Sequence, residues 1–250
     1  RSEDAAFAVV GAMAIYAVRL AGLQLGDPVL IFGQGLIGLV ATQIARIAGA
    51  TPIGVIDVVE ERLALARELG ADFAIHARDR DVLERMTRSM PGGGPAASID
   101  LCGIASAIDT AVAVTRRGGR VVTGSLMPGG HHVDVYGRAW MAGVSIVGAY
   151  FNARPWQLDA TETTPPVDWP IRLTNAGRYQ GSEITTSLGD IEIFIRMLSC
   201  DRLRLQCLVG EWVTAGEAPG MFMRLPHSNT LGHFIRWQPH AADVQPGRAG

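Results

Sequence analysis

Short apolar runs alternate with longer segments of helical spacing from residue 28 onward. The four consecutive apolar residues at 29–32 predict a strand that is covered on both faces. Apolar residues then recur at helical spacing over Leu36–Ala48, and Gly49 ends that segment. Further strands are expected at 53–56, 73–75, 99–102, 120–124 and 144–147, and further helices at 61–69, 81–90 and 105–115. This order predicts an α/β fold, a doubly wound six-stranded parallel sheet of the Rossmann type.

The two ends of the chain depart from this alternation. Residues 5–18 are apolar or small, but they are too few to span a membrane and wrongly flanked for a signal peptide. They predict a buried helix. Residues 152–188 are rich in Pro, Thr and Gly and predict a long excursion whose role the sequence does not define. Helices are expected at 190–200 and 215–223, strands at 207–213 and 233–237, and a polar tail at 238–250.

Composition narrows the choice of partners and compartment. The chain has 22 Lys and Arg against 24 Asp and Glu, so its net charge of −2 argues against a nucleic-acid or anionic-membrane partner. Its three cysteines provide neither a disulfide framework nor a C-x-x-C zinc knuckle. A reducing, cytoplasmic compartment is therefore expected.

The strongest local motif is G-x-G-x-x-G at residues 33–38, placed between a predicted strand and a predicted helix. Gly33 permits a tight turn, Gly35 lets the backbone approach a pyrophosphate, and Gly38 allows helix and strand to pack closely. The free N–H groups at the start of the helix, around Leu36 and Ile37, would face the phosphates. The alternative is an ordinary strand–turn–helix.

An acidic residue in the second strand supports a dinucleotide site. Asp57 ends that strand nineteen residues after Gly38, where a carboxylate accepts hydrogen bonds from the adenosine ribose and repels the 2′-phosphate of NADP. Asp57 therefore predicts NAD(H) over NADP(H), a plain turn aspartate being the alternative. Arg62 is a candidate to pack against the adenosine, the alternative being a solvated residue in the first helical turn.

Three blocks give the chain a wider resemblance: 26–38, 62–72 and 117–122. From about residue 5 to 237 it resembles the medium-chain dehydrogenase/reductase superfamily, in the zinc-type alcohol, sorbitol and threonine dehydrogenase branch. The resemblance implies that the ends of the fourth, fifth and sixth strands line the cofactor. Near the ribose it places Cys102 and Gly103; beside the nicotinamide it places Thr123, Gly124, Ser125, Ala149, Tyr150 and Phe151.

The departures from the family pattern concern the metal and the domains. Family members carry a preceding barrel-like domain that supplies the substrate pocket and zinc ligands. Residues 1–20 are thus expected to link to a missing N-terminal domain, 21–200 to bind the dinucleotide, and 201–237 to be a C-terminal remnant of the catalytic domain. The family spacing puts Val9 where a further zinc ligand usually lies, and valine cannot bind zinc. Zinc is therefore predicted to be absent, and no catalytic residue is assigned.

The remaining candidate residues favour structural interpretations. His131 and His132 follow a Pro-Gly-Gly turn and predict a solvated loop rather than a metal site. Cys200 and Cys207 are expected to be packed rather than reactive. In the terminal segment, His227 and His233 receive no role, while Leu208, Val209 and Trp212 are expected to form an exposed apolar face that favours a homodimer or aggregation.

These observations favour an NAD-dependent oxidoreductase of the alcohol dehydrogenase type, which transfers hydride between a secondary alcohol or polyol and NAD. The alternative is a non-catalytic NAD-binding module: a truncated chain, one half of a split protein or a pseudoenzyme. On either interpretation the chain alone is expected to show little or no alcohol dehydrogenase activity. The substrate itself is not indicated by the sequence.

Overall fold

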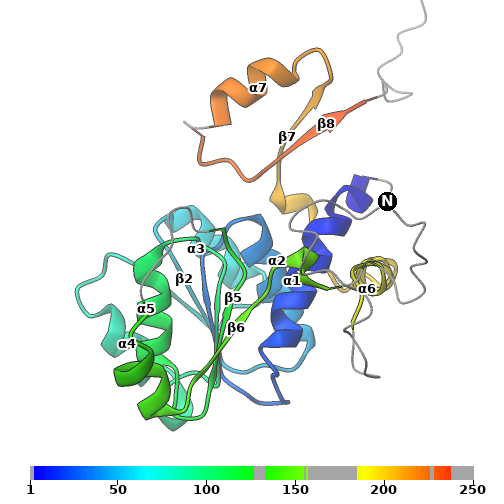
Figure 1. The fold of residues 1–250 in the computed structure, drawn as a ribbon. Helices are drawn as coiled ribbons and strands as arrows, with labels where there is room; N and C mark the ends of the chain where they lie inside the picture. The colour runs from blue at the N-terminus through cyan, green and yellow to red at the C-terminus, as the bar shows by residue number, and fades with distance from the viewer. Residues whose placement is uncertain (1–2, 127–132, 155, 157–184, 226–227, 238–250) are drawn as a thin grey trace, which may run out of the picture.

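The computed structural model describes residues 3–126, 133–154, 156, 185–225 and 228–237. Six strands form one parallel sheet in the order β3-β2-β1-β4-β5-β6. Their bounds are β1 Val29–Phe32, β2 Ile53–Asp57, β3 Phe73–His76, β4 Ala97–Asp100, β5 Arg120–Thr123 and β6 Ser145–Gly148. The doubly wound α/β sheet expected from the sequence is confirmed (Figure 1).

Successive residues of the central strand enter two different cores, because side chains alternate between the faces of a sheet. In β1, Val29 and Ile31 join one apolar cluster, and Leu30 and Phe32 join the other. The first cluster includes residues of α1 Ala8–Leu20, α2 Leu36–Ile47, α3 Glu60–Glu68 and α6 Ser187–Ser199, and the second includes residues of α4 Val82–Arg88 and α5 Ala105–Val114. Burial on both faces explains why the strand is apolar at every position (Figure 1).

The apolar run near the start of the chain forms a short 3₁₀ helix, η1 Glu3–Phe7, followed by α1. α1 packs against α2 and α6, and the approach to α6 is close because Gly11 lacks a side chain. A Cβ at Gly11 would lie 2.2 Å from the ring of Phe194. In the described part of the chain, no helix is both long and apolar enough to cross a bilayer.

The C-terminal strands form a separate small sheet. β7 Val209–Thr214 and β8 Gly232–Arg236 pair in parallel, and α7 Ala218–Arg224 lies between them in the chain (Figure 1). The ring of Phe234 lies 4.8 Å from those of Phe7 and Trp212.

The expectation that Leu208 belongs to an exposed apolar face is wrong, because Leu208 is fully buried. A 3₁₀ turn, η7 Gln206–Leu208, precedes β7, and the Leu208 side chain joins the core that contains α1 and α6. Val209 and Trp212 are half-buried, and Arg236 lies over the Trp212 ring at 5.2 Å.

Several boundaries differ from the sequence-based expectation. β4 begins and ends two residues early because Ala97 pairs with Val29, and this places Cys102 in the loop beyond the strand. A π-helix, η3 Val135–Trp140, and short 3₁₀ helices, η2 Pro91–Gly93 and η4 Phe151–Ala153, were not anticipated. His131, His132, His227, the tail 238–250 and most of the excursion lie outside the described residues.

Candidate cofactor-binding site

The carboxyl ends of all six parallel strands meet at one edge of the sheet. Phe32, which ends β1, lies opposite Ile56 of β2 and Asp100 of β4. The strand order reverses between β1 and β4, and in open α/β sheets ligands bind outside the carboxyl ends at such a switch point. The fold therefore provides a crevice at this edge before any particular side chain is considered.

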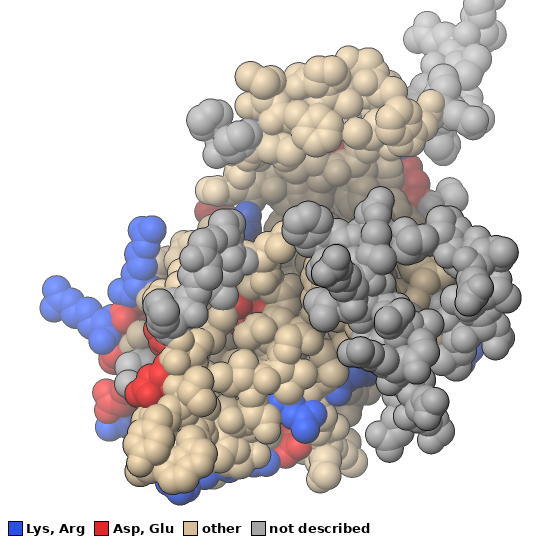
Figure 2. All heavy atoms as spheres, in the orientation of Figure 1, with Lys and Arg blue, Asp and Glu red and all other residues tan. Residues whose placement is uncertain are grey.

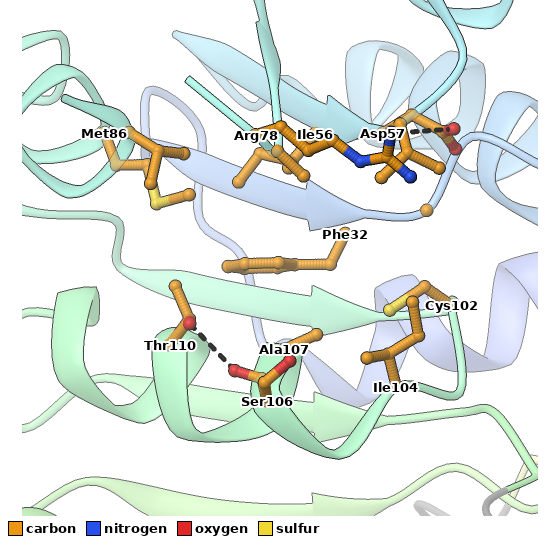
Figure 3. Close-up of a pocket in the computed structure, with 14 residues that line it drawn as sticks. Phe32, Ile56, Asp57, Arg78, Met86, Cys102, Ile104, Ser106, Ala107 and Thr110 are labelled. Atoms are coloured by element: carbon orange, nitrogen blue, oxygen red, sulfur yellow. Dashed lines mark hydrogen bonds between the residues drawn. The ribbon is translucent and has the colours of Figure 1, made fainter. Parts of the chain in front are cut away.

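A cavity of about 290 Å³ opens at this edge between the ends of β1, β2 and β4 and helices α4 and α5 (Figure 3). Its inner wall is apolar and includes Phe32, Met86 and Ile104. Asp57 and Arg78 lie on the β2–β3 side, and Ser106 and Thr110 face them from α5; Gly33 and Cys102 also line the cavity. An apolar slot with polar groups around it suits a flat heteroaromatic ring attached to a sugar.

Each glycine of the motif at 33–38 meets a different steric requirement. Gly33 has φ +87°, a left-handed conformation that glycine adopts without strain. A Cβ at Gly38 would lie 1.9 Å from the carbonyl oxygen of Gly33, so only glycine fits there. A Cβ at Gly35 would have nothing within 4 Å, which leaves space beside the start of α2. Leu36 and Ile37 begin that helix, whose unpaired N–H groups favour an anion.

Gln34, between the first two glycines, is a buried connector that sequence reasoning missed. Its side chain is fully buried, its amide nitrogen donates to the Gly33 carbonyl at 3.2 Å, and its amide oxygen accepts from Thr42 at 3.0 Å. Its backbone N–H donates to Asp57 at 2.5 Å. The signal available in the sequence was a long amide side chain placed between two glycines, Gly33 and Gly35.

Asp57 is largely occupied by the backbone. One oxygen accepts from the N–H groups of Val58 and Val59 at 2.7 and 2.9 Å, and the other accepts from Gln34. A carboxylate has about four acceptor positions, so about one remains for a ligand. Asp57 thus shapes the turn between β2 and α3 and still borders the cavity.

The two arginines near Asp57 have different surroundings. Arg62, which is predicted to pack against the adenosine, donates to the carbonyl of Asn229 in the C-terminal segment at 3.3 Å. Its Nε is buried and has no partner among the described residues. Arg78, which sequence reasoning did not single out, lines the cavity and extends toward Asp57 (Figure 3). Its position after β3 was a signal that could have been used.

The ends of β5 and β6 form the other half of the edge. The N–H of Gly124 donates to the Asp100 carbonyl at 2.9 Å, and the N–H of Ala149 donates to the Thr123 carbonyl at 2.8 Å. The Ser125 hydroxyl donates to the Asp100 carboxylate at 2.7 Å. Tyr150 is 39% exposed at the end of β6. The structure thus brings the predicted residues 123–125 and 149–150 to one edge with Asp100, which sequence reasoning missed.

Cys102 lies in the loop after β4, with its thiol 2.9 Å from the Asp100 carboxylate. Burial and the neighbouring Asp100 carboxylate raise the pKa of Cys102 to about 12. A thiol with so high a pKa is a poor nucleophile at neutral pH, because the thiolate is the reactive form. Cys102 is therefore a wall of the site rather than a reactive group.

This difference predicts the order of cysteine alkylation. The expectation that Cys200 and Cys207 are packed is wrong, because both are exposed. In iodoacetamide labelling at pH 8 they should therefore react before Cys102. Burial also raises the pKa of Cys207, so Cys200 should react first. Peptide mass spectrometry over a time course measures the order; Cys102 reacting as fast as Cys200 would contradict the assignment.

The described residues do not fit a zinc ion. They contain no group of three or more His, Cys, Asp or Glu side chains that could hold a metal. Val9 lies half-exposed on α1 and carries no donor. The His233 ring already has a partner within the C-terminal sheet, since its Nδ1 lies 2.9 Å from the Glu211 carboxylate. That hydrogen bond and Arg224 hold the pKa of Glu211 below its usual range.

On the described residues of the face shown in Figure 2, charge of one sign is not concentrated in one area. Figure 2 shows Arg side chains interspersed with Asp and Glu on the face it presents. This pattern agrees with the net charge of −2. The face shown therefore lacks the continuous basic surface that a nucleic acid requires.

Comparison with known proteins identifies the family. The zinc-binding dehydrogenase family model matches residues 37–164, just over half of the chain. Rat sorbitol dehydrogenase is 34% identical over 129 residues, which cover 50% of this chain and 36% of that protein.

Two solved structures share the fold. A zinc-binding dehydrogenase from Sinorhizobium meliloti, bound to NADP, matches with a TM-score of 0.72 and 20% identity. A short chain alcohol dehydrogenase from E. coli CFT073, in complex with NADH, matches with a TM-score of 0.71 and 17% identity. Each match covers 92% of this chain and 58% of the other chain. This chain therefore spans little more than half of these structures, and less than half of the sorbitol dehydrogenase.

Proposed function

Because this chain belongs to the zinc-binding dehydrogenase family, we propose that it binds NAD as part of an oxidoreductase acting on a secondary alcohol or polyol. The oxidoreductase class follows from the family and from relatives named alcohol and sorbitol dehydrogenases. The choice of NAD and of the substrate class is the proposal. The described residues contribute the sheet edge to this proposed activity.

The observation that supports NAD is the position of Asp57. Its carboxylate borders the cavity at the end of β2, with about one acceptor position still open. A ribose hydroxyl can donate to that position, whereas a 2′-phosphate would bring negative charge against it. Arg78, on the same side, would partly offset this repulsion, so we expect a preference rather than complete exclusion.

The residues of this chain would bind and orient the dinucleotide, while the nicotinamide ring supplies the hydride acceptor when bound. The start of α2 faces the pyrophosphate, and the space at Gly35 lets the backbone approach it. The ends of β5 and β6 hold the second half of the dinucleotide, with Thr123 and Tyr150 at the edge. This chain's described residues provide no metal donor set, so no step of proton removal from an alcohol is assigned to them.

The alternative, a non-catalytic NAD-binding module, is supported by the same observation, that the described residues gather no set of three or more metal donors. It differs in activity and not in cofactor binding. We also propose a homodimer in the cytoplasm; the exposed, stacked rings of Tyr136 and Trp140 in η3, which packs against α5, support the dimer.

Isothermal calorimetry with NADH and NADPH tests the cofactor assignment. We expect NADH to bind at least about tenfold more tightly, and Asp57→Asn to reduce that preference, since the variant removes the charge that repels a 2′-phosphate. Glu61→Gln, which neutralises an exposed acid in the first turn of α3, is the matched control and should leave the preference unchanged. Equal or tighter NADPH binding by the unmodified chain would overturn the NAD assignment.

A further inference from the structure

Asp100 is a buried acid at the switch point whose role the proposed function leaves open. It ends β4, between Phe32 of β1 and Thr123 of β5, and its side chain is fully buried. Charged side chains are rarely buried so completely unless they are paired. A buried carboxylate at the ligand-binding edge of the sheet therefore requires an explanation.

All the hydrogen bonds that the structure gives the Asp100 carboxylate come from neutral donors. One oxygen accepts from the N–H and the thiol of Cys102 at 3.1 and 2.9 Å, and the other accepts from the Ser125 hydroxyl at 2.7 Å. Within the described ranges, no Arg or His forms an ion pair with it. The Asp100 side chain is thus hydrogen-bonded but has no cationic partner among the described residues.

The topology indicates which half of a dinucleotide lies near this side chain. The fold consists of two mononucleotide-binding halves, and Asp57 marks the half formed by β1–β3 as the adenosine half. The second mononucleotide then lies over the half formed by β4–β6. Asp100 ends the first strand of that half. In NAD the second mononucleotide is the nicotinamide mononucleotide, whose ring carries a positive charge when oxidised and none when reduced.

We propose that Asp100 acts as a buried carboxylate and is a specificity-determining residue that favours the oxidised, positively charged nicotinamide over the reduced ring. This inference rests on the proposed function. A buried charge acts through a low-dielectric interior and is screened less by salt than a surface charge is. Its field therefore reaches a ring in the crevice without direct contact and stabilises NAD⁺ relative to NADH.

The test measures dissociation constants of NAD⁺, NADH and ADP-ribose for the unmodified chain and for Asp100→Asn. We expect the variant to weaken NAD⁺ about three- to tenfold more than NADH, and to leave ADP-ribose, which lacks the nicotinamide, nearly unchanged. The asparagine can keep the local bonds, because its oxygen accepts from Cys102 and its NH₂ can donate to the Ser125 hydroxyl. Asp100→Ser provides a second uncharged variant if the first does not fold.

A matched control separates charge from positioning. Ser125→Ala removes one hydrogen bond but retains the charge, so it should change NAD⁺ and NADH affinity by the same factor. An equal NAD⁺ to NADH ratio in Asp100→Asn, Asp100→Ser and the unmodified chain would overturn the inference while NADH binding still supports the proposed function. A shift of the ratio in Ser125→Ala as large as that in Asp100→Asn would also overturn it. Failure of the unmodified chain to bind ADP-ribose or NADH would overturn the proposed function itself.

Discussion

Replacing Asp190 with alanine should lower the free energy of unfolding by about 3–5 kcal/mol. Asp190 is 1% exposed on α6 and accepts from two arginines: Arg19 of α1, at 3.0 Å, and Arg154, which follows η4. Arg154 is itself buried, its guanidinium lies 4.0 Å from the centre of the Tyr16 ring, and its Nε and Nη2 have no partner among the described residues. Loss of the carboxylate would leave a buried guanidinium without its counter-ion.

Urea unfolding followed by circular dichroism measures this loss. Glu84→Ala is a suitable control, because Glu84 pairs with Arg88 on the surface of α4, where both side chains are more than half exposed. Exposed ion pairs contribute about 0–1 kcal/mol, so the control should change stability little. If Asp190→Ala costs no more than Glu84→Ala, the buried pair does not hold α6 against α1.

Replacing Gly38 with alanine should destabilise the chain by about 3 kcal/mol and abolish cofactor binding. The added Cβ would lie 1.9 Å from the Gly33 carbonyl oxygen, which belongs to the backbone and cannot rotate away as a side chain could. Relief of the clash requires α2 to move from the end of β1. The N–H groups at the start of α2 would then leave the position from which they face a pyrophosphate.

Gly35→Ala is the matched variant in the same turn. Gly35 has φ −72°, which alanine also adopts, and its added Cβ would meet no atom within 4 Å. The free energy of unfolding of Gly35→Ala should therefore differ from that of the unmodified chain by less than about 1 kcal/mol. Its NADH affinity should fall at least about tenfold, because the methyl group fills space that the pyrophosphate needs. Thermal melts and NADH calorimetry on both variants measure the two effects. Equal stability of Gly38→Ala and Gly35→Ala would contradict this account of the turn.

The sheet could be predicted from sequence because its signals are local. An uninterrupted apolar run such as Val29–Phe32 has few interpretations when a glycine turn and a helical pattern follow it. The motif at 33–38 and Asp57 could be found for the same reason, since a turn and a strand end place them within one β-α-β unit. Boundaries were less accurate, as at β4, because the register with β1 decides where pairing begins.

The features that sequence reasoning missed depend on contacts between distant residues. The burial of Asp100 involves Ser125, twenty-five residues away, and Asp190 meets Arg154 across thirty-six residues. Leu208 was expected to be exposed because its own neighbours do not reveal that α1 and α6 cover it. Single-sequence patterns give the faces of an element but not which other element covers them.

The close approach of Gly11 to Phe194 has a consequence for the order of folding. These residues belong to helices near opposite ends of the chain, and the six-stranded sheet lies between them in sequence. Contacts between residues so far apart require closure of a very long loop, so they form late unless the intervening chain is already compact. Once the sheet has formed, it fixes α1 against α2, and α6 meets a prepared surface. The docking of α6 onto α1 is therefore expected to complete folding rather than begin it.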